Sequence, residues 1–269
     1  MIGSSTMSNI KRLVNEGAIF YCSHSGGKDS QAMYAHLSKV VPHDQIVVVH
    51  ADLGRVEWEG TQDHVKATTQ HELNVVRAFY KDGRPKTLLN YVRHRFSVRP
   101  DAPSWPSSAS RWCTSELKTG PIRKFIRADM KARGVKKAVN CIGIRAEESR
   151  ARSKKSPFKI NPELSRAGRE VWDWMPIFEL STDQVFSIIE KTGQQPFWIY
   201  GAGNHRMSCV LCVLADENDI RNGARHRPDL VAEYRALEKE TGWTVFHKKS
   251  LQERINPNLI PVVNIEVAA

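Results

Sequence analysis

The segment at residues 25–30, Ser-Gly-Gly-Lys-Asp-Ser, combines residue types that bind phosphate groups. An apolar run at residues 18–22 precedes it and a helical pattern at residues 29–40 follows it, which predicts a buried strand, a tight glycine turn and a helix start. Glycines let backbone N–H groups approach an oxyanion, and the N-terminus of a helix adds partial positive charge. This arrangement predicts a binding site for a phosphate chain.

Side chains of the same segment add to this site. Lys28 supplies a positive point charge, and Asp29 supplies a carboxylate that can hold a hydrated Mg²⁺. Ser25 and Ser30 supply hydroxyl donors. The segment differs from a Walker A loop, because the spacer between the first Gly and Gly-Lys-Ser/Thr is missing. The alternative interpretation is that residues 25–30 form an ordinary glycine turn before a helix and bind no phosphate.

Three of the five cysteines have positions suited to a metal centre. Cys209 and Cys212 have the spacing at which one turn of chain presents two thiolates to one metal. Cys113 lies between a loop and a predicted helix, where a helix N-terminus favours the thiolate, and it is the best candidate for a third ligand. Cys22 and Cys141 lie within apolar strands and are expected to pack as small hydrophobes. An unliganded Cys209–Cys212 pair is the alternative.

Strand-like apolar runs alternate with helical patterns in the first half of the chain. The run at residues 45–51 is continuous, as expected for a parallel strand covered on both faces of a sheet. This alternation predicts an α/β fold with a doubly wound, mostly parallel sheet, whose ligand lies at the carboxyl ends of the strands. Strands are predicted at residues 18–22, 45–51, 73–79 and 137–143, helices at 29–40, 59–71, 87–96 and 118–133, and a Pro- and Ser-rich loop at 97–112.

Three further residues lie at that edge. Asp52 comes directly after the second strand, although capping a loop is nearly as good an interpretation. Gly143 ends the last of these strands, and Arg145 after it is a candidate phosphate clamp. Residues 147–150 are either part of this site or a solvated helix start.

The second half of the chain predicts a smaller, helical extension. Residues 145–169 are charged and poor in large apolar residues, which predicts a mobile flap or loop. Amphipathic helices are predicted at residues 181–189 and 228–241. We therefore expect a nucleotide-binding α/β domain at 1–195 and a Cys-x-x-Cys and helical segment at 196–269, packed on the same domain.

The composition predicts a basic protein without a membrane span. The chain of 269 residues has a formal net charge of +11 and a mean hydropathy of -0.45. Such a balance attracts polyanions, either ATP or a nucleic acid, and the basic residues are densest at 145–159 and 221–227. No apolar run approaches the length of a membrane span, and the polar N-terminus lacks a secretory pattern, so we expect a cytoplasmic protein.

Five motifs in order resemble the phosphoadenosine phosphosulfate reductase family, within the adenine nucleotide alpha-hydrolase superfamily of pyrophosphate-loop enzymes. The resemblance covers about residues 17–243 and implies an adenine nucleotide alpha-hydrolase-like fold. The matching motifs are Ser-Gly-Gly-Lys-Asp-Ser at 25–30, His-Ala-Asp-Leu-Gly at 50–54, Arg-Trp-Cys-Thr-Ser-Glu-Leu-Lys at 111–118, Gly-Ile-Arg-Ala-Glu-Glu-Ser at 143–149, and Cys-x-x-Cys at 209–212 with Arg206 before it.

The chain also departs from the reductases in three ways. Its loop is intact, whereas reductases of this family generally have a degenerate one. The tail at residues 256–269 contains no cysteine, although the reductases carry a nucleophilic cysteine near the C-terminus. A Cys-Cys pair of the cluster-bearing members reads Cys113-Thr114 here, so one cluster ligand is absent.

The resemblance therefore implies the chemistry of the members that act in DNA phosphorothioation and tRNA thiolation. These enzymes adenylate an oxygen, expel pyrophosphate and let a sulfur nucleophile displace AMP. On this reading a [4Fe-4S] cluster is held by Cys113, Cys209 and Cys212, and the partners are ATP, DNA or tRNA, and a sulfur donor such as a cysteine desulfurase. A Cys₃His zinc site completed by His205 or His226 is the alternative to the cluster.

The roles of the loop residues follow from this chemistry. Lys28 would neutralise charge on the leaving pyrophosphate, and Asp29 would position Mg²⁺. The β and γ phosphates would be cradled by Ser25, Gly26, Gly27 and Ser30. Two other functions stay open: a sulfonucleotide reductase or sulfate-activating enzyme of sulfur assimilation, and a nucleotide-binding defence or regulatory subunit without turnover. The acceptor, the sulfur donor and the oligomeric state do not follow from the sequence.

Overall fold

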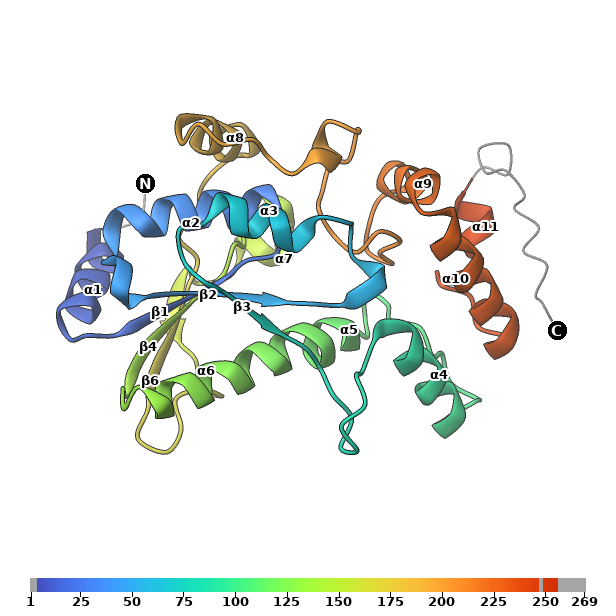
Figure 1. Cartoon of the computed structure of the whole chain (residues 1–269), viewed down its shortest axis with the longest axis horizontal. Coiled ribbons are helices and arrows are strands. Elements are labelled where there is room, and N and C mark those ends of the chain that lie inside the picture. The colour runs from blue at the N-terminus through green and yellow to red at the C-terminus, as the bar shows by residue number, and fades with distance from the viewer. Residues whose placement is uncertain (1–3, 247–248, 256–269) are drawn as a thin grey trace. The chain divides into compact units, whose positions relative to one another are not determined.

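A computed structural model of the chain describes residues 4–246 and 249–255 and contains one six-stranded sheet (Figure 1). The strand order is β3-β2-β1-β4-β6-β5, and every pairing is parallel except that of β5 with β6. The α/β fold with a mostly parallel sheet that the sequence predicts is therefore confirmed. The strands are β1 (Ile19–Ser23), β2 (Ile46–Ala51), β3 (Leu73–Val76), β4 (Lys137–Cys141), β5 (Phe158–Ile160) and β6 (Glu170–Trp174).

Helices flank the strands and make up most of the remaining regular structure. The segment Ser115–Thr119 between α5 and α6 is a π-helix. The helices are α1 (Ser4–Asn15), α2 (Lys28–Val40), α3 (Thr61–Thr68), α4 (Leu88–Val98), α5 (Trp112–Thr114), α6 (Gly120–Ala132), α7 (Arg150–Ser153), α8 (Thr182–Lys191), α9 (Glu217–His226), α10 (Pro228–Thr241) and α11 (Leu251–Arg254), with 3₁₀ turns at His43–Gln45, Gly54–Val56, Ala146–Glu148 and Trp198–Tyr200. No helix among the described residues is both long and apolar enough to span a membrane.

The central strands β1 and β2 are mostly apolar because the sheet is covered on both faces. One core packs α1, α2, α3 and α8 against the sheet, with Phe20 and Val48 among its fully buried residues. The other packs α6 against the opposite face, where Tyr21 and Val49 are fully buried. Successive residues of β1 and β2 thus enter different cores, which explains why neither strand alternates with polar residues.

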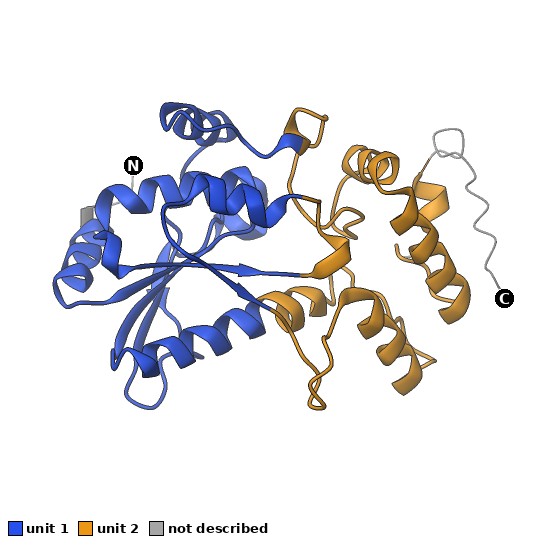
Figure 2. Cartoon of the chain, in the orientation of Figure 1, with its two compact units in different colours: residues 1–52, 60–76, 119–198 blue, residues 53–59, 77–118, 199–269 orange. Residues whose placement is uncertain are grey.

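The chain divides into two compact units (Figure 2). Unit 1 comprises residues 1–52, 60–76 and 119–198 and contains the sheet. Unit 2 comprises residues 53–59, 77–118 and 199–269 and contains α4, α5, α9, α10 and α11. The predicted domain boundary at residues 195–196 is close to the last passage of the chain between the units, whereas the two earlier segments of unit 2 had no counterpart in the sequence prediction.

The segment at residues 145–169 differs from the loop that its composition predicts. It contains the short helix α7 and the strand β5, which pairs with β6 at the edge of the sheet. Two features hid these strands from the sequence: β5 has three residues, and β6 reads Glu-Val-Trp-Asp-Trp, without an apolar run. The helix α1 was likewise not expected. The cysteine-free tail at residues 256–269 lies outside the described residues.

Candidate functional site

The predicted phosphate loop connects β1 to α2 at the carboxyl end of β1. Its entry is fixed where the N–H of His24 donates to the carbonyl of Val49 on β2, at 2.8 Å. Gly26 has a φ of 82°, a conformation that side chains other than glycine rarely adopt. Gly27 is the N-cap of α2, and the helix begins at Lys28. The strand, glycine turn and helix start therefore lie in the order that the sequence predicts.

Ser30 and His24 hold the loop from inside. The Ser30 hydroxyl donates to the carbonyl of Gly27 at 2.8 Å and accepts the N–H of Ser25 at 3.2 Å. The N–H of Gly26 donates to Nδ1 of His24 at 3.1 Å, so the neutral ring carries its proton on Nε2. Burial, followed by the nearby His50 and His64, lowers the pKa of His24 to about 3. The imidazole is therefore a neutral acceptor that fixes the turn.

The carboxylate of Asp29 lies between two cations. Its Oδ1 is 2.6 Å from Nε of Arg145, and its Oδ2 is 3.6 Å from Nζ of Lys28. The Arg145 side chain is only 4% exposed, and it also donates to the carbonyl of Leu180 and the hydroxyl of Thr182, both at 3.2 Å. Since the protein holds this guanidinium on several sides, Arg145 orients Asp29 as well as neutralising it.

Gly143 brings the end of β4 against the same loop. A Cβ at this position would lie 3.3 Å from the carbonyl carbon and oxygen of Asp29 and 3.3 Å from the nitrogen of Ser30. The close approach explains the glycine without any unusual backbone angle, because Gly143 is not among the described glycines with positive φ. Gly143, Arg145 and the loop thus come together at one edge of the sheet.

Asp52 and His50 complete this edge from β2. Asp52 is 7% exposed, and its N–H donates to the carbonyl of Val76 at 2.9 Å, which holds it beyond the end of the strand. His50 is 1% exposed, and its Nδ1 lies 2.9 Å from the carbonyl oxygen of His24. Asp52 was predicted from the sequence, whereas His24 and His50 had no predicted role. The sequence shows how far these two histidines lie from the glycines along the chain, but it does not show that their side chains are buried.

The three predicted metal ligands all belong to unit 2. Cys113 lies on α5, and the Cys209–Cys212 turn is fixed where the N–H of Val210 donates to the carbonyl of Val56 at 2.9 Å. Burial raises the pKa of Cys209 to about 12, against the lowering effect of Lys118. Burial and then Cys212 raise the pKa of Cys113. Each thiol is therefore close enough to the others for their charges to interact.

Lys118 and Tyr234 surround these thiols, and the sequence analysis gave neither a role. The pKa of Lys118 is raised, first by Cys209 and further by Cys212 and Cys113. The Tyr234 side chain is fully buried, and its hydroxyl has no hydrogen-bond partner among the described residues. A cation and an orphaned donor beside three thiols fit an anionic sulfur-rich group such as an iron–sulfur cluster. Lys118 and Tyr234 thus offer a positive charge and a hydrogen-bond donor beside the three thiols.

The predicted zinc alternative has less geometric support. Tetrahedral zinc with Zn–S bonds of about 2.3 Å holds its ligand atoms about 4 Å apart. In the described part of the chain, the three ligand atoms found within 4.8 Å of one another belong to His205, Asp216 and Asp219, and no cysteine joins them. His226 packs edge-on against Trp58, with ring centroids 6.0 Å apart.

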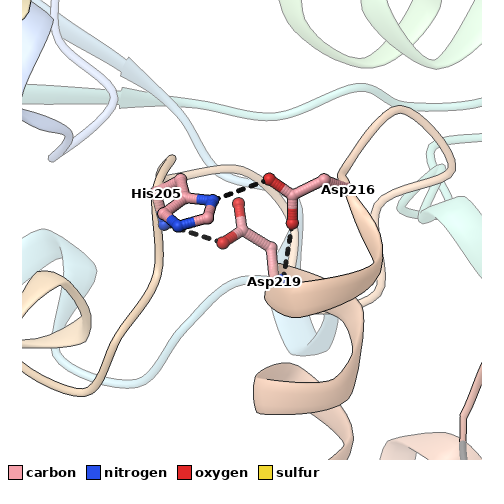
Figure 3. Close-up of side chains that lie close together, drawn as sticks. All are labelled: His205, Asp216 and Asp219. Atoms are coloured by element: carbon pink, nitrogen blue, oxygen red, sulfur yellow. Dashed lines mark hydrogen bonds and ion pairs between the residues drawn. The ribbon is translucent and has the colours of Figure 1, made fainter.

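The His205 group itself has a structural explanation (Figure 3). Asp219 accepts the N–H groups of His205 and Arg206 at 2.7 and 3.1 Å. Asp216 accepts the N–H of Asp219 at 2.8 Å as the N-cap of α9, and its other oxygen is 2.9 Å from Nδ1 of His205. These carboxylates anchor the turn before α9.

The remaining two cysteines are core residues, as the sequence predicts. Cys22 and Cys141 are fully buried and pair in register between β1 and β4. Burial raises the pKa of both thiols, so both stay protonated.

Comparisons with known proteins place the chain in a family. A family model described as "Phosphoadenosine phosphosulfate reductase domain" matches residues 19–215. An uncharacterized protein of Methanocaldococcus jannaschii, MJ0066, is 24% identical over 80% of this chain and 40% of its own length. An uncharacterized 37.8 kDa protein of Escherichia phage 186 is 24% identical over 60% of this chain and 49% of its own. The chain spans less than half the length of these two relatives.

Two solved structures show more distant similarity. A phosphoadenylyl-sulfate reductase from Candida auris, in a phosphate complex, is 14% identical with a TM-score of 0.46, over 78% of this chain and 96% of that one. A Candida glabrata FMN adenylyltransferase in complex with FAD and inorganic pyrophosphate is 13% identical with a TM-score of 0.40, over 78% of this chain and 67% of that one.

Proposed function

The chain belongs to the phosphoadenosine phosphosulfate reductase domain family, and on this premise we propose that it is an ATP pyrophosphatase that adenylates an acceptor for sulfur transfer. The observation that carries the proposal is the intact loop, in which Asp29 lies between Lys28 and the buried Arg145. An enzyme that only binds a nucleotide needs a phosphate cradle. One that expels pyrophosphate also needs a fixed cation where charge develops on the leaving group, and Lys28 supplies one.

The proposed reaction divides among the loop residues. An acceptor oxygen attacks the α-phosphorus of ATP, the bond from that phosphorus to the bridging oxygen breaks, and pyrophosphate leaves with that oxygen. Lys28 neutralises charge on the pyrophosphate, while Ser25, Gly26, Gly27 and Ser30 cradle its oxygens. Asp29 takes Mg²⁺, which shields the phosphate charges when bound.

The residues around the nucleotide have supporting roles. Arg145 holds the Asp29 carboxylate in place, and Gly143 lets β4 approach the loop without a side chain between them. Asp52, whose N–H is held at the end of β2, would accept hydrogen bonds from the nucleotide. Neutral His24 keeps the Gly26 turn in one conformation. The loop therefore loses less conformational entropy when the phosphates bind.

The second half of the proposal concerns the cysteines of unit 2. Cys113, Cys209 and Cys212 would hold a [4Fe-4S] cluster, which would supply an iron without a protein ligand that can carry sulfide. Lys118 would balance the negative charge of the thiolates, and the Tyr234 hydroxyl would donate to a sulfur atom. The acceptor that best suits a chain with a net charge of +11 is a nucleic acid, either DNA or tRNA.

Pyrophosphate release tests the first half directly. Purified protein is incubated with ATP and Mg²⁺, alone or with DNA or tRNA, and pyrophosphate and AMP are measured. We expect release that nucleic acid stimulates and that Asp29→Asn abolishes. Sulfite formed from a phosphosulfate nucleotide, without ATP cleavage, would instead identify a reductase. Nucleotide binding without any product would identify a regulatory subunit.

Spectroscopy of anaerobically purified protein tests the second half. We expect iron and acid-labile sulfide with broad visible absorption, lost in Cys209→Ser and retained in Cys22→Ser. Stoichiometric zinc without iron would contradict the cluster.

A further inference from the structure

A basic hairpin and the helix after it form a projecting segment of unit 2, residues 77–99. The hairpin is closed by the antiparallel bridge between Phe79 and Pro85 and turns at Gly83, whose φ is 85°. It is visible in Figure 1 as the narrow loop between β3 and α4. From the sequence, this segment was predicted to hold the end of a strand at 73–79, a helix at 87–96 and the start of a loop at 97–112, without a function.

The segment holds much of the charge of the protein. Its seven cations are Arg77, Lys81, Arg84, Lys86, Arg93, Arg95 and Arg99, and its single carboxylate is Asp82. These 23 residues thus contribute +6 to the formal net charge of +11.

Two of these cations lie in exposed ion pairs, whereas Lys86, whose side chain is 15% exposed, pairs with Glu116 at 3.1 Å. Arg84 pairs with Asp82 at 2.7 Å and Arg93 pairs with Glu240 at 2.9 Å, with both partners of each pair about half exposed or more. Exposed pairs of this kind contribute about 0–1 kcal/mol and are screened by salt. Arg84 and Arg93 can therefore exchange these partners for phosphates at little cost.

Aromatic rings are interleaved with these cations. Phe79 is 54% exposed although it is a large apolar residue, and so it presents an open ring on the hairpin. On α4, the rings of Tyr91 and His94 stack with centroids 5.8 Å apart. Lys86 lies over the ring of Tyr91 at 4.6 Å, and Arg84 lies over the ring of Tyr80 at 5.4 Å. Exposed rings stack on nucleic-acid bases, and neighbouring cations bind the phosphates between those bases.

We propose that residues 77–99 bind a single-stranded stretch of nucleic acid. The proposal rests on the proposed function, because it names the surface that takes the acceptor. Single strands fit better than duplexes, since a duplex hides the base faces on which Phe79 would stack. A second copy of the chain is a poor partner for this segment. Two copies of the segment, each with a formal net charge of +6, would repel each other.

The test is binding of fluorescent oligonucleotides to the full chain, measured by anisotropy at several salt concentrations. Stacking of one base is worth about 1–3 kcal/mol, so Phe79→Ala should weaken binding roughly fivefold or more. Each phosphate contact to a single strand contributes about 0.7 to the salt slope, so Lys81→Ala with Arg84→Ala should lower that slope by about 1.4. Single-stranded DNA and RNA are both tested, which distinguishes the two kinds of acceptor.

Matched controls keep the result interpretable. Lys154→Ala with Lys155→Ala removes two exposed charges from unit 1 and should leave affinity and salt slope near those of the wild type. The inference would be overturned if both double variants lost affinity and salt slope equally, or if Phe79→Ala bound as tightly as the wild type. It would also be overturned if the protein preferred a duplex or anionic vesicles, or if the wild type did not bind. Since binding is measured without ATP, an absence of pyrophosphate release would count against the proposed function alone.

Discussion

Replacing Gly143 with alanine would place one methyl group against the backbone of the phosphate loop. That methyl carbon would lie 3.3 Å from three backbone atoms of Asp29 and Ser30. Comfortable contacts between such atoms begin at about 3.5 Å, so the loop or the end of β4 must move by a few tenths of an ångström. Neither partner is the end of a flexible side chain, and the loop therefore has to shift.

The size of the effect follows from that shift. Mispositioning by about 1 Å costs about 10²-fold in rate, so a few tenths of an ångström should lower kcat/KM for ATP roughly fourfold. Stability should hardly change, because a mild overpacking penalty of about 1 kcal/mol is offset by the reduced entropy of the unfolded chain, about 0.4–1 kcal/mol. A loss of activity without a loss of stability is the expected signature.

The assay combines pyrophosphate release, ATP binding by calorimetry and thermal unfolding. Gly223→Ala is the contrasting variant, because its new Cβ would lie 2.3 Å from the carbonyl oxygen of Val210, between Cys209 and Cys212. It should lower iron content and stability. The reasoning is refuted if Gly143→Ala binds and cleaves ATP like the wild type, or if its melting temperature falls as far as that of Gly223→Ala.

Three further predictions concern single charges. Arg145→Met removes the guanidinium that holds Asp29 and should cost about 3 kcal/mol in urea unfolding, with partial recovery in Arg145→Lys; an unchanged midpoint would contradict the assigned role. Because the pKa of His24 is lowered from 6.5 to about 3, the unfolded chain binds a proton that the folded chain does not, so its share of the stability is complete above pH 6.5 and falls by about 1.4 kcal/mol per unit on acidification towards pH 3. His24→Asn keeps an acceptor for Gly26 but cannot titrate, and its unfolding free energy should depend less steeply on pH in this window; equal slopes would contradict the buried neutral ring. Lys118→Met should lower the iron retained per chain, whereas an unchanged iron content would show that the thiols need no cation.

Sequence predicted the central sheet because its physical cause is local. The continuous apolar run of β2 follows from burial on both faces, and that pattern can be read without any knowledge of the neighbours. The glycines at 26 and 27 and the serine at 30 likewise mark a strand–turn–helix unit by spacing alone. Parallel topology then puts Asp52, Gly143 and the loop at one edge, which is where the structure has them.

The features that sequence did not predict depend on contacts between distant segments. β5 and β6 have too few apolar residues to be recognised, and they are strands because they pair with each other and with β4. Lys118 ends one of the five motifs but had no predicted role in the sequence, and only the approach of Cys209 gives it one. His24 needed both its burial and the Gly26 N–H to be identified as a neutral acceptor.

Arg145 shows how contacts refine a role that a motif suggests. As a residue after a strand end it was a candidate phosphate clamp, a role that needs its guanidinium to face the ligand. In the structure that guanidinium is 4% exposed and engages Asp29, Leu180 and Thr182. A group held on so many sides cannot turn towards a phosphate without breaking several hydrogen bonds, whereas Asp29, at 22% exposure, can still present an oxygen outward. The contacts therefore favour Arg145 as the residue that positions Asp29.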